Sequence, residues 1–145
     1  MEKFSRILVP VDGSEGADKA VDTAVTLAEA CGAALDILYV SYFDSETDAA
    51  EDDDTWLTGI VAAPTGQQIR SVLERAMHRV PDGVEATAHQ RTGNPARRVV
   101  EFSREHGNET IVVGARGLDF VRGFLLGSVS QEIMEEAPGA VIIVK

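Results

Sequence analysis

Glycines gather in one segment of the 145-residue chain in a pattern suited to binding phosphate. Two residues separate Gly114 from Gly117, and nine more lead to Gly127 and Ser128. Glycine lets a backbone approach a ligand closely, and the first turn of a helix offers N–H groups and the positive end of its dipole. Together the four residues predict a phosphate cradle. Taken singly, Gly114 is more typical of a strand-end turn, and Ser128 with Gln131 is typical of a capping box; only together, at the end of a strand, do these residues favour the cradle.

Alternating apolar strands and amphipathic helices are expected to position this cradle. The strands are short apolar runs, and the helices begin at capping residues and end at glycine or proline. The expected strands are 4–11, 34–42, 84–91, 110–113 and 140–144; the expected helices follow Ser14 to Gly32, Thr65 to Val80, Asn94 to Gly107 and Ser128 to Ala137.

This order of elements predicts one α/β domain over residues 1–145, with a doubly wound parallel sheet and helices on both faces. In such sheets ligands bind outside the carboxyl ends of the strands, where the strand order reverses. Two segments are therefore expected to lie side by side at the site, namely 10–14 after the first strand and 114–128 after the fourth.

The Gly-x2-Gly-x9-Gly-Ser pattern resembles the ATP-binding signature of the universal stress protein family. Three further segments, Ile7–Ser14, Gly93–Ala96 and Leu125–Ser130, are similar to that family's first strand, Gly-x-Pro-Ala element and last helix start. The resemblance covers nearly the whole chain. It implies a flavodoxin-like five-stranded sheet of order 3-2-1-4-5, with ATP bound across strands one and four.

The resemblance also implies a role for each matching residue. Asp12 would accept a hydrogen bond from a ribose hydroxyl, although a turn-forming aspartate before Gly13 explains it equally well from sequence alone. Arg116 is an even choice between a γ-phosphate contact and a solvated surface residue. The implied nucleotide-binding residues are Pro10, Val11 and Asp12 beside ribose and adenine, Val40 at adenine, and Gly114, Arg116, Gly117, Gly127, Ser128 and Val129 at the phosphates, with Mg²⁺ as the accompanying ion.

Two positions depart from the family pattern. Glu109-Thr110 stands where an aspartate commonly precedes the fourth strand, and Pro138-Gly139-Ala140 leads into the last strand. Family members commonly form homodimers by pairing their last strands, which are residues 140–144 here, and such pairing would cover a bare sheet edge.

Composition narrows the function classes. The net charge of −11 argues against general nucleic-acid binding, which needs clustered Lys and Arg. Residues 44–64 are expected to form an acidic mobile loop, whose Trp56 is interpreted as an anchor on the surface. No stretch reaches the length of a membrane span, and a single cysteine fits a reducing compartment, so the expected location is the cytoplasm.

The remaining titratable groups show no sign of chemistry. His78, His89 and His106 lie at no metal-ligand spacing and are assigned surface or helix-end roles, with no metal site expected. Cys31 falls on the apolar stripe of the first helix and is expected to be a buried small hydrophobe.

The leading functional hypothesis is a nucleotide-dependent stress-response or signalling regulator with at most slow ATP hydrolysis. There is no Gly-x4-Gly-Lys-Ser/Thr loop, and no lysine lies between Lys19 and Lys145. A dehydrogenase would need Gly-x-Gly-x-x-Gly after the first strand, an adenylyl transferase a His-x-Gly-His pair, and a receiver domain an aspartate after the third strand; none is present. The alternative is a nucleotide-independent interaction module of the same fold, because some family members lack the glycine pattern.

Overall fold

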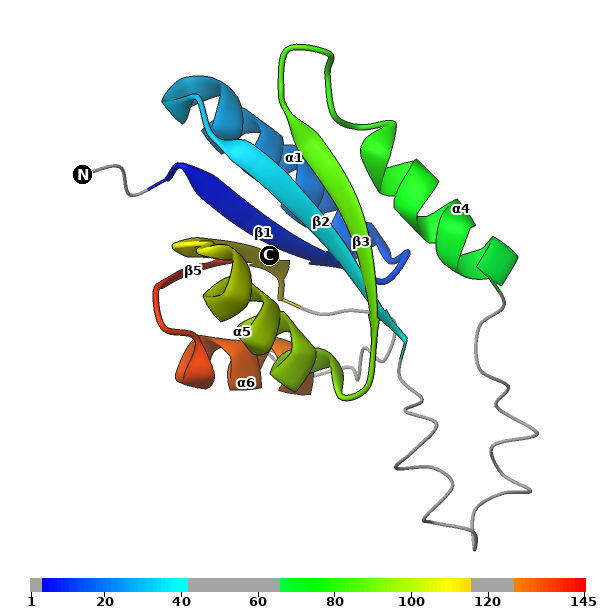
Figure 1. Cartoon of the computed structure of the whole chain (residues 1–145), viewed down its shortest axis with the longest axis vertical. Coiled ribbons are helices and arrows are strands. Elements are labelled where there is room, and N and C mark those ends of the chain that lie inside the picture. The colour runs from blue at the N-terminus through cyan, green and yellow to red at the C-terminus, as the bar shows by residue number, and fades with distance from the viewer. Residues whose placement is uncertain (1–3, 42–65, 116–126) are drawn as a thin grey trace, which may run out of the picture.

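A computed structural model describes residues 4–41, 66–115 and 127–145, and these form a parallel sheet between helices (Figure 1). The strand order β3-β2-β1-β4-β5 confirms the predicted flavodoxin-like arrangement. The strands are β1 (Arg6–Val11), β2 (Ala34–Ser41), β3 (Ala86–Thr92), β4 (Thr110–Gly114) and β5 (Ala140–Val144), and the helices are α1 (Glu15–Cys31), α4 (Gly66–Met77), α5 (Pro95–His106) and α6 (Ser128–Glu136).

Each face of the sheet carries its own apolar core, because alternate strand residues point to opposite faces. Ile7, Val9 and Ile37 pack against α1 and α4 on one face. Leu8 and Leu38 pack against α5 and α6 on the other. Figure 1 shows α1 behind the sheet and α5 and α6 in front of it. Cores on both faces explain why β1 and β2 are nearly continuous apolar runs.

Local signals set the ends of α1 and α5 as the sequence predicts. The Ser14 hydroxyl accepts a hydrogen bond from the Ala17 N–H at 3.1 Å and caps α1. The Asn94 side chain accepts from the Arg97 N–H at 3.0 Å and caps α5. Gly32 and Gly107 end these helices with φ angles of 67° and 69°, a conformation that favours glycine.

The end of α1 differs from expectation. Cys31 is exposed, so the prediction of a buried thiol is wrong. The apolar stripe of α1 is buried up to Ala28, one turn earlier, and the helix ends at Cys31 before the αL residue Gly32. A helical stripe predicts burial only where a neighbouring element covers it.

The pairing of β1 with β4 is short. Of the described residues in these two strands, the parallel ladder pairs Ile7 with Thr110 and Leu8 with Ile111, whereas β1 and β2 pair through all six β1 residues. The strand order reverses at this β1–β4 junction, so the sheet has its topological switch point where its ladder is shortest.

Glu109 ties three chain segments together at the opposite, amino end of this junction. Its carboxylate accepts from the Ser5 hydroxyl at 2.5 Å and from the Arg6 N–H at 2.7 Å, and its carbonyl accepts from the Ala140 N–H at 3.0 Å. Burial alone would raise the pKa of Glu109, but these hydrogen bonds lower it overall. The side chain of the glutamate that departs from the family pattern therefore holds the start of β1, and its backbone carbonyl holds the start of β5.

Candidate functional site

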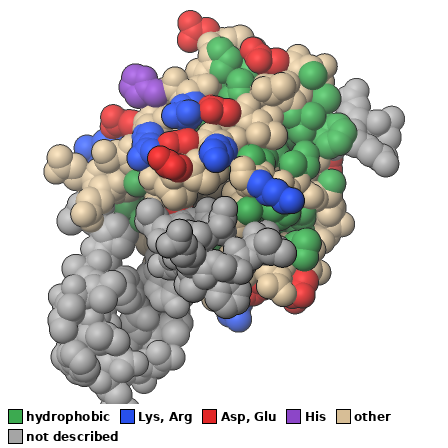
Figure 2. Space-filling view, turned by 180° about the vertical axis from the view of Figure 1, so that it is seen from behind, with side chains coloured by type: hydrophobic (Ala, Val, Ile, Leu, Met, Phe, Trp, Pro, Cys, Tyr) green, Lys and Arg blue, Asp and Glu red, His purple; other side chains and the backbone are tan. Residues whose placement is uncertain are grey.

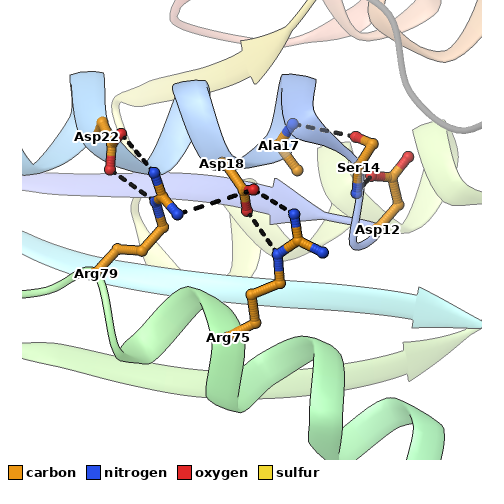
Figure 3. A network of polar contacts seen from close by, with 7 residues as sticks. All are labelled: Asp12, Ser14, Ala17, Asp18, Asp22, Arg75 and Arg79. Atoms are coloured by element: carbon orange, nitrogen blue, oxygen red, sulfur yellow. Dashed lines mark hydrogen bonds and ion pairs between the residues drawn. The ribbon is translucent and has the colours of Figure 1, made fainter.

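A tight turn holds Asp12 at the carboxyl end of β1. The Asp12 Oδ1 accepts a hydrogen bond from the Ser14 N–H at 2.9 Å, and Gly13 between them has a φ of 86° (Figure 3). A Cβ on Gly13 would lie 3.3 Å from the Val72 Cγ2, so α4 packs directly over the turn. The turn-forming role of Asp12 is thus present, and the turn also holds its carboxylate at the edge of the switch point.

The Asp12 carboxylate affects a phenol on the neighbouring strand. Tyr39 lies opposite Val11 in the β1–β2 register and is half-buried. Burial raises the pKa of Tyr39, and the negative charge of Asp12 raises it further.

Gly114 lies at the carboxyl end of β4, beside the first turn of α1. A Cβ on Gly114 would lie 2.7 Å from the Gly16 carbonyl oxygen, a distance that Cβ atoms do not adopt. The absence of a side chain lets the amino end of α1 pack directly on β4. This packing reason for Gly114 is separate from the ligand reason that the sequence pattern suggests.

The amino end of α6 is brought to the same place. The Gly127 N–H donates to the Ala115 carbonyl at 2.6 Å, and the Ser130 hydroxyl donates to the Gly114 carbonyl at 2.6 Å. Gly114 thus lies between the first turns of α1 and α6. Both helices direct the positive end of their dipole towards the carboxyl end of β4, which favours an anion there.

The start of α6 departs from the capping-box interpretation. Gly127 is the N-cap, it contributes no side-chain cap, and Ser128 is the first helical residue. Ser128 is exposed, and Val129 is 38% exposed. The Ser128 hydroxyl is therefore accessible at the helix start.

The other predicted site residues are distributed as follows. Pro10 is half-buried and Val11 is 7% exposed, both directly before the Asp12 turn. Val40 is half-buried near the end of β2 and lies opposite Arg91 in the β2–β3 register. The structure brings together the Asp12, Gly114 and Gly127–Val129 segments. Arg116 and Gly117, like the predicted acidic loop 44–64, lie outside the described residues.

The sequence matches the universal stress protein family over residues 3–145. The chain belongs to that family. It is 34% identical to the universal stress protein YxiE of Bacillus subtilis over 98% of this chain and 99% of that protein.

Two solved structures of family members share the fold. A universal stress protein in complex with cAMP superposes with a TM-score of 0.71 and 25% identity, covering 97% of this chain and 96% of the other. The universal stress protein of Archaeoglobus fulgidus in complex with dAMP superposes with a TM-score of 0.69 and 18% identity, covering all of both chains.

In this family member a ladder of ion pairs joins α1 to α4 and to the turn that follows α4, beside the Asp12 turn (Figure 3). Arg75 binds the Asp18 carboxylate through two nitrogens. Arg79 binds Asp22 through two nitrogens at 2.9 Å and also approaches Asp18 at 3.8 Å. Figure 2 shows the band of alternating basic and acidic side chains on this face. The ladder fixes the helix whose Val72 covers Gly13.

Sequence reasoning missed a buried polar cluster on the opposite face of the sheet. Asp36 is 2% exposed and accepts from Arg6 at 2.7 Å, Asn108 at 2.9 Å and His89 at 2.9 Å. Burial raises the pKa of Asp36, but the hydrogen bonds from Arg6, Asn108 and His89 outweigh it and lower the pKa overall. The surface role predicted for His89 is therefore wrong. The one available signal was an acidic residue inside the apolar run of β2.

Two hollows among the described residues lie away from the switch point. One, of about 140 Å³, is between β3 and α5 and includes Arg91 and Arg98. The other, of about 400 Å³, is an apolar groove between α4 and β3 that includes Ile69 and Leu73. Neither is lined by a predicted site residue.

Proposed function

We propose that this protein binds an adenine nucleotide, with ATP as the ligand, across the carboxyl ends of β1 and β4. The observation that carries the proposal is the convergence at Gly114 of the first turns of α1 and α6, through the Gly16 contact and the Ala115–Gly127 hydrogen bond. Two helix dipoles and the N–H groups of a glycine-initiated helix favour phosphate at this position.

Each end of the nucleotide has a candidate set of residues. Asp12, held by its turn on the other side of the β1–β4 junction, would accept from a ribose hydroxyl, with Pro10, Val11 and Val40 towards the adenine. Gly114, Gly127, Ser128 and Val129 would face the phosphates, together with Arg116 and Gly117. The family member solved with cAMP supports an adenine nucleotide as the class of ligand.

Magnesium would accompany ATP. Within residues 4–41, 66–115 and 127–145, no group of three or more His, Cys, Asp or Glu side chains is arranged to hold a metal ion. Mg²⁺ is commonly held by substrate phosphates, water and one or two protein oxygens. The Ser128 hydroxyl and the Asp12 carboxylate are oxygen donors of that kind, so the residues present fit an ion that arrives with the nucleotide.

The proposed role is that of a stress-response or signalling regulator in the cytoplasm. Its ATP hydrolysis would be slow, because the chain has no P-loop and no lysine between Lys19 and Lys145. None of the helices in the described part of the chain is long and apolar enough to cross a membrane. We propose that two copies pair through β5, whose residues 141–144 are half-buried at the sheet edge.

Calorimetric titration with Mg-ATP tests the ligand. We expect saturable micromolar binding to the unaltered protein, and its loss in a Gly127→Val and Ser128→Ala double variant. A Gly66→Val and Ser71→Ala variant carries the same substitutions at exposed positions on α4 and should bind normally. If the unaltered protein takes up no nucleotide and releases none on denaturation, the nucleotide-independent interaction module is the better account. Capture of a protein partner unaffected by ATP would support that alternative.

A further inference from the structure

Ser130 carries a side-chain hydroxyl that is bonded across the two halves of the glycine motif. It is the third residue of α6 and is 4% exposed. Its Oγ donates to the carbonyl oxygen of Gly114 at 2.6 Å. Ser130 lies outside the Gly-x2-Gly-x9-Gly-Ser pattern, and its hydroxyl is buried and bonded to the Gly114 carbonyl.

The Ser130 bond is one of several hydrogen bonds that join the end of β4 to the start of α6. Ala115 is held on both sides, since its N–H donates to the Val144 carbonyl at 2.8 Å and its carbonyl accepts from the Gly127 N–H at 2.6 Å. With the Ser130 bond, β4 and α6 are joined by two adjacent short contacts. These contacts set where the first turn of α6 lies relative to the end of β4.

Gly114 is confined from its other side as well. The Gly16 carbonyl of α1 occupies the space that a Cβ on Gly114 would need. Ser130 therefore holds α6 against a backbone segment that α1 already fixes. A phosphate group between the two helix ends needs N–H groups held in place before it binds, because ordering them on binding lowers affinity.

We infer that Ser130 is a positioning residue for nucleotide phosphates: it holds the amino end of α6 at Gly114 so that the α6 N–H groups face the ligand. This inference rests on the proposed function. If Ser130 served only to satisfy a backbone carbonyl, its loss would lower the stability of the protein. It would not weaken binding of the phosphates more than binding of the adenosine part.

The chain offers a matched control for this distinction. Ser103 on α5 is 2% exposed, and its Oγ donates to the Val100 carbonyl at 2.7 Å. Ser103→Ala thus removes a buried hydroxyl bond of the same type within a helix away from the switch point. Comparing it with Ser130→Ala separates the loss of a buried hydrogen bond from the loss of the Gly114 bond.

The first measurement needs no ligand. Amide hydrogen exchange by NMR should be faster at Gly127 in Ser130→Ala than in the unaltered protein, and unchanged at Gly127 in Ser103→Ala. Equal Gly127 exchange in all three proteins would overturn the positioning role, whether or not nucleotide binds.

The second measurement compares ATP with adenosine by calorimetry, at a temperature where all three proteins are folded by circular dichroism. We expect Ser130→Ala to weaken ATP binding about fivefold, the size of one lost net hydrogen bond. Adenosine binding should change by less than about twofold, as for an independent site. Ser130→Thr, which keeps a hydroxyl, should recover ATP binding.

The outcomes separate the two proposals. If the unaltered protein binds ATP and Ser130→Ala weakens ATP and adenosine equally, the inference is wrong and the proposed function stands. If the unaltered protein binds neither ligand, the proposed function fails, and the role of Ser130 towards phosphate fails with it. This holds even if faster Gly127 exchange in Ser130→Ala shows that the Ser130 bond orders the start of α6.

Discussion

Replacing Asp36 with asparagine should remove a defined part of the stability of this fold. The carboxylate is 2% exposed and accepts three hydrogen bonds. Asparagine has the same shape but only one acceptor oxygen, and Asn108 and His89 bond different oxygens of Asp36. It can therefore keep one of these two bonds, and it turns its NH₂ group towards the residue whose bond is lost. A hydrogen bond to a charged group contributes about 1.5–3 kcal/mol. The Arg6 side chain is 45% exposed, so its pair with Asp36 contributes about 1 kcal/mol or less.

The expected loss at pH 7 is therefore about 2–4 kcal/mol. Its pH dependence has a definite sign. The folded-state pKa of Asp36 is lowered, so its stabilising effect is complete above the unfolded-state pKa of about 4 and is lost as the pH falls through the lower folded-state value. The stability difference between the two proteins should thus shrink as the pH falls below about 4.

Urea denaturation followed by far-ultraviolet circular dichroism, at matched protein concentration from pH 7 to 3, measures this difference. Asp82→Asn makes the same chemical change at an exposed turn residue and should alter the free energy of unfolding by less than about 0.5 kcal/mol. A loss under about 1 kcal/mol for Asp36→Asn at pH 7 would show that the cluster contributes no more than a surface pair. A loss that persisted undiminished at pH 3 would refute the assignment to the ionised carboxylate.

Three further predictions follow from contacts described above. Gly114→Ala forces a Cβ to 2.7 Å from a backbone oxygen of α1, so urea denaturation should show that the free energy of unfolding falls by about 1–3 kcal/mol. Gly66→Ala, with nothing within 4 Å of its Cβ, should leave it unchanged, and equal effects would contradict the packing argument. The double variant Arg75→Gln, Arg79→Gln should melt at a lower temperature in dilute buffer, with a difference that narrows in molar salt because salt screens exposed charges; a salt-independent difference would point to packing instead. The Ala140 N–H and the Val144 carbonyl point towards β4, so the Val141 N–H faces the open edge of the sheet. Val141→Pro removes that N–H and should convert the proposed β5-paired dimer to a monomer in analytical ultracentrifugation. A folded dimer in this variant would exclude that interface.

The sequence predicted those features that local rules determine. Ser14 and Asn94 as helix caps and Gly32 as a helix end depend on neighbouring residues alone, and the structure confirms them. The alternation of strands and helices predicted a parallel sheet, and the resemblance to a known family implied its order.

The features that were missed depend on residues far apart in the chain. The partners of Asp36 lie 30, 53 and 72 positions away, so no local pattern indicates them. The exposure of Cys31 depends on where the cover over α1 ends, which helical periodicity cannot show. For Gly114 the sequence suggested close approach of a ligand, and the structure adds close approach of α1, a tertiary contact that no spacing along the chain encodes.

The short β1–β4 ladder has a consequence for how the chain folds. β1, β2 and β3 can assemble through pairings between neighbouring segments, whereas the bond from the Arg6 N–H to Glu109 joins residues 103 positions apart. Closing so long a loop costs entropy, and the short β1–β4 ladder offsets little of that cost. This junction should therefore form late in folding and open early in unfolding. A nucleotide bound across it would slow unfolding by holding together the two halves of the sheet at the place where they separate first.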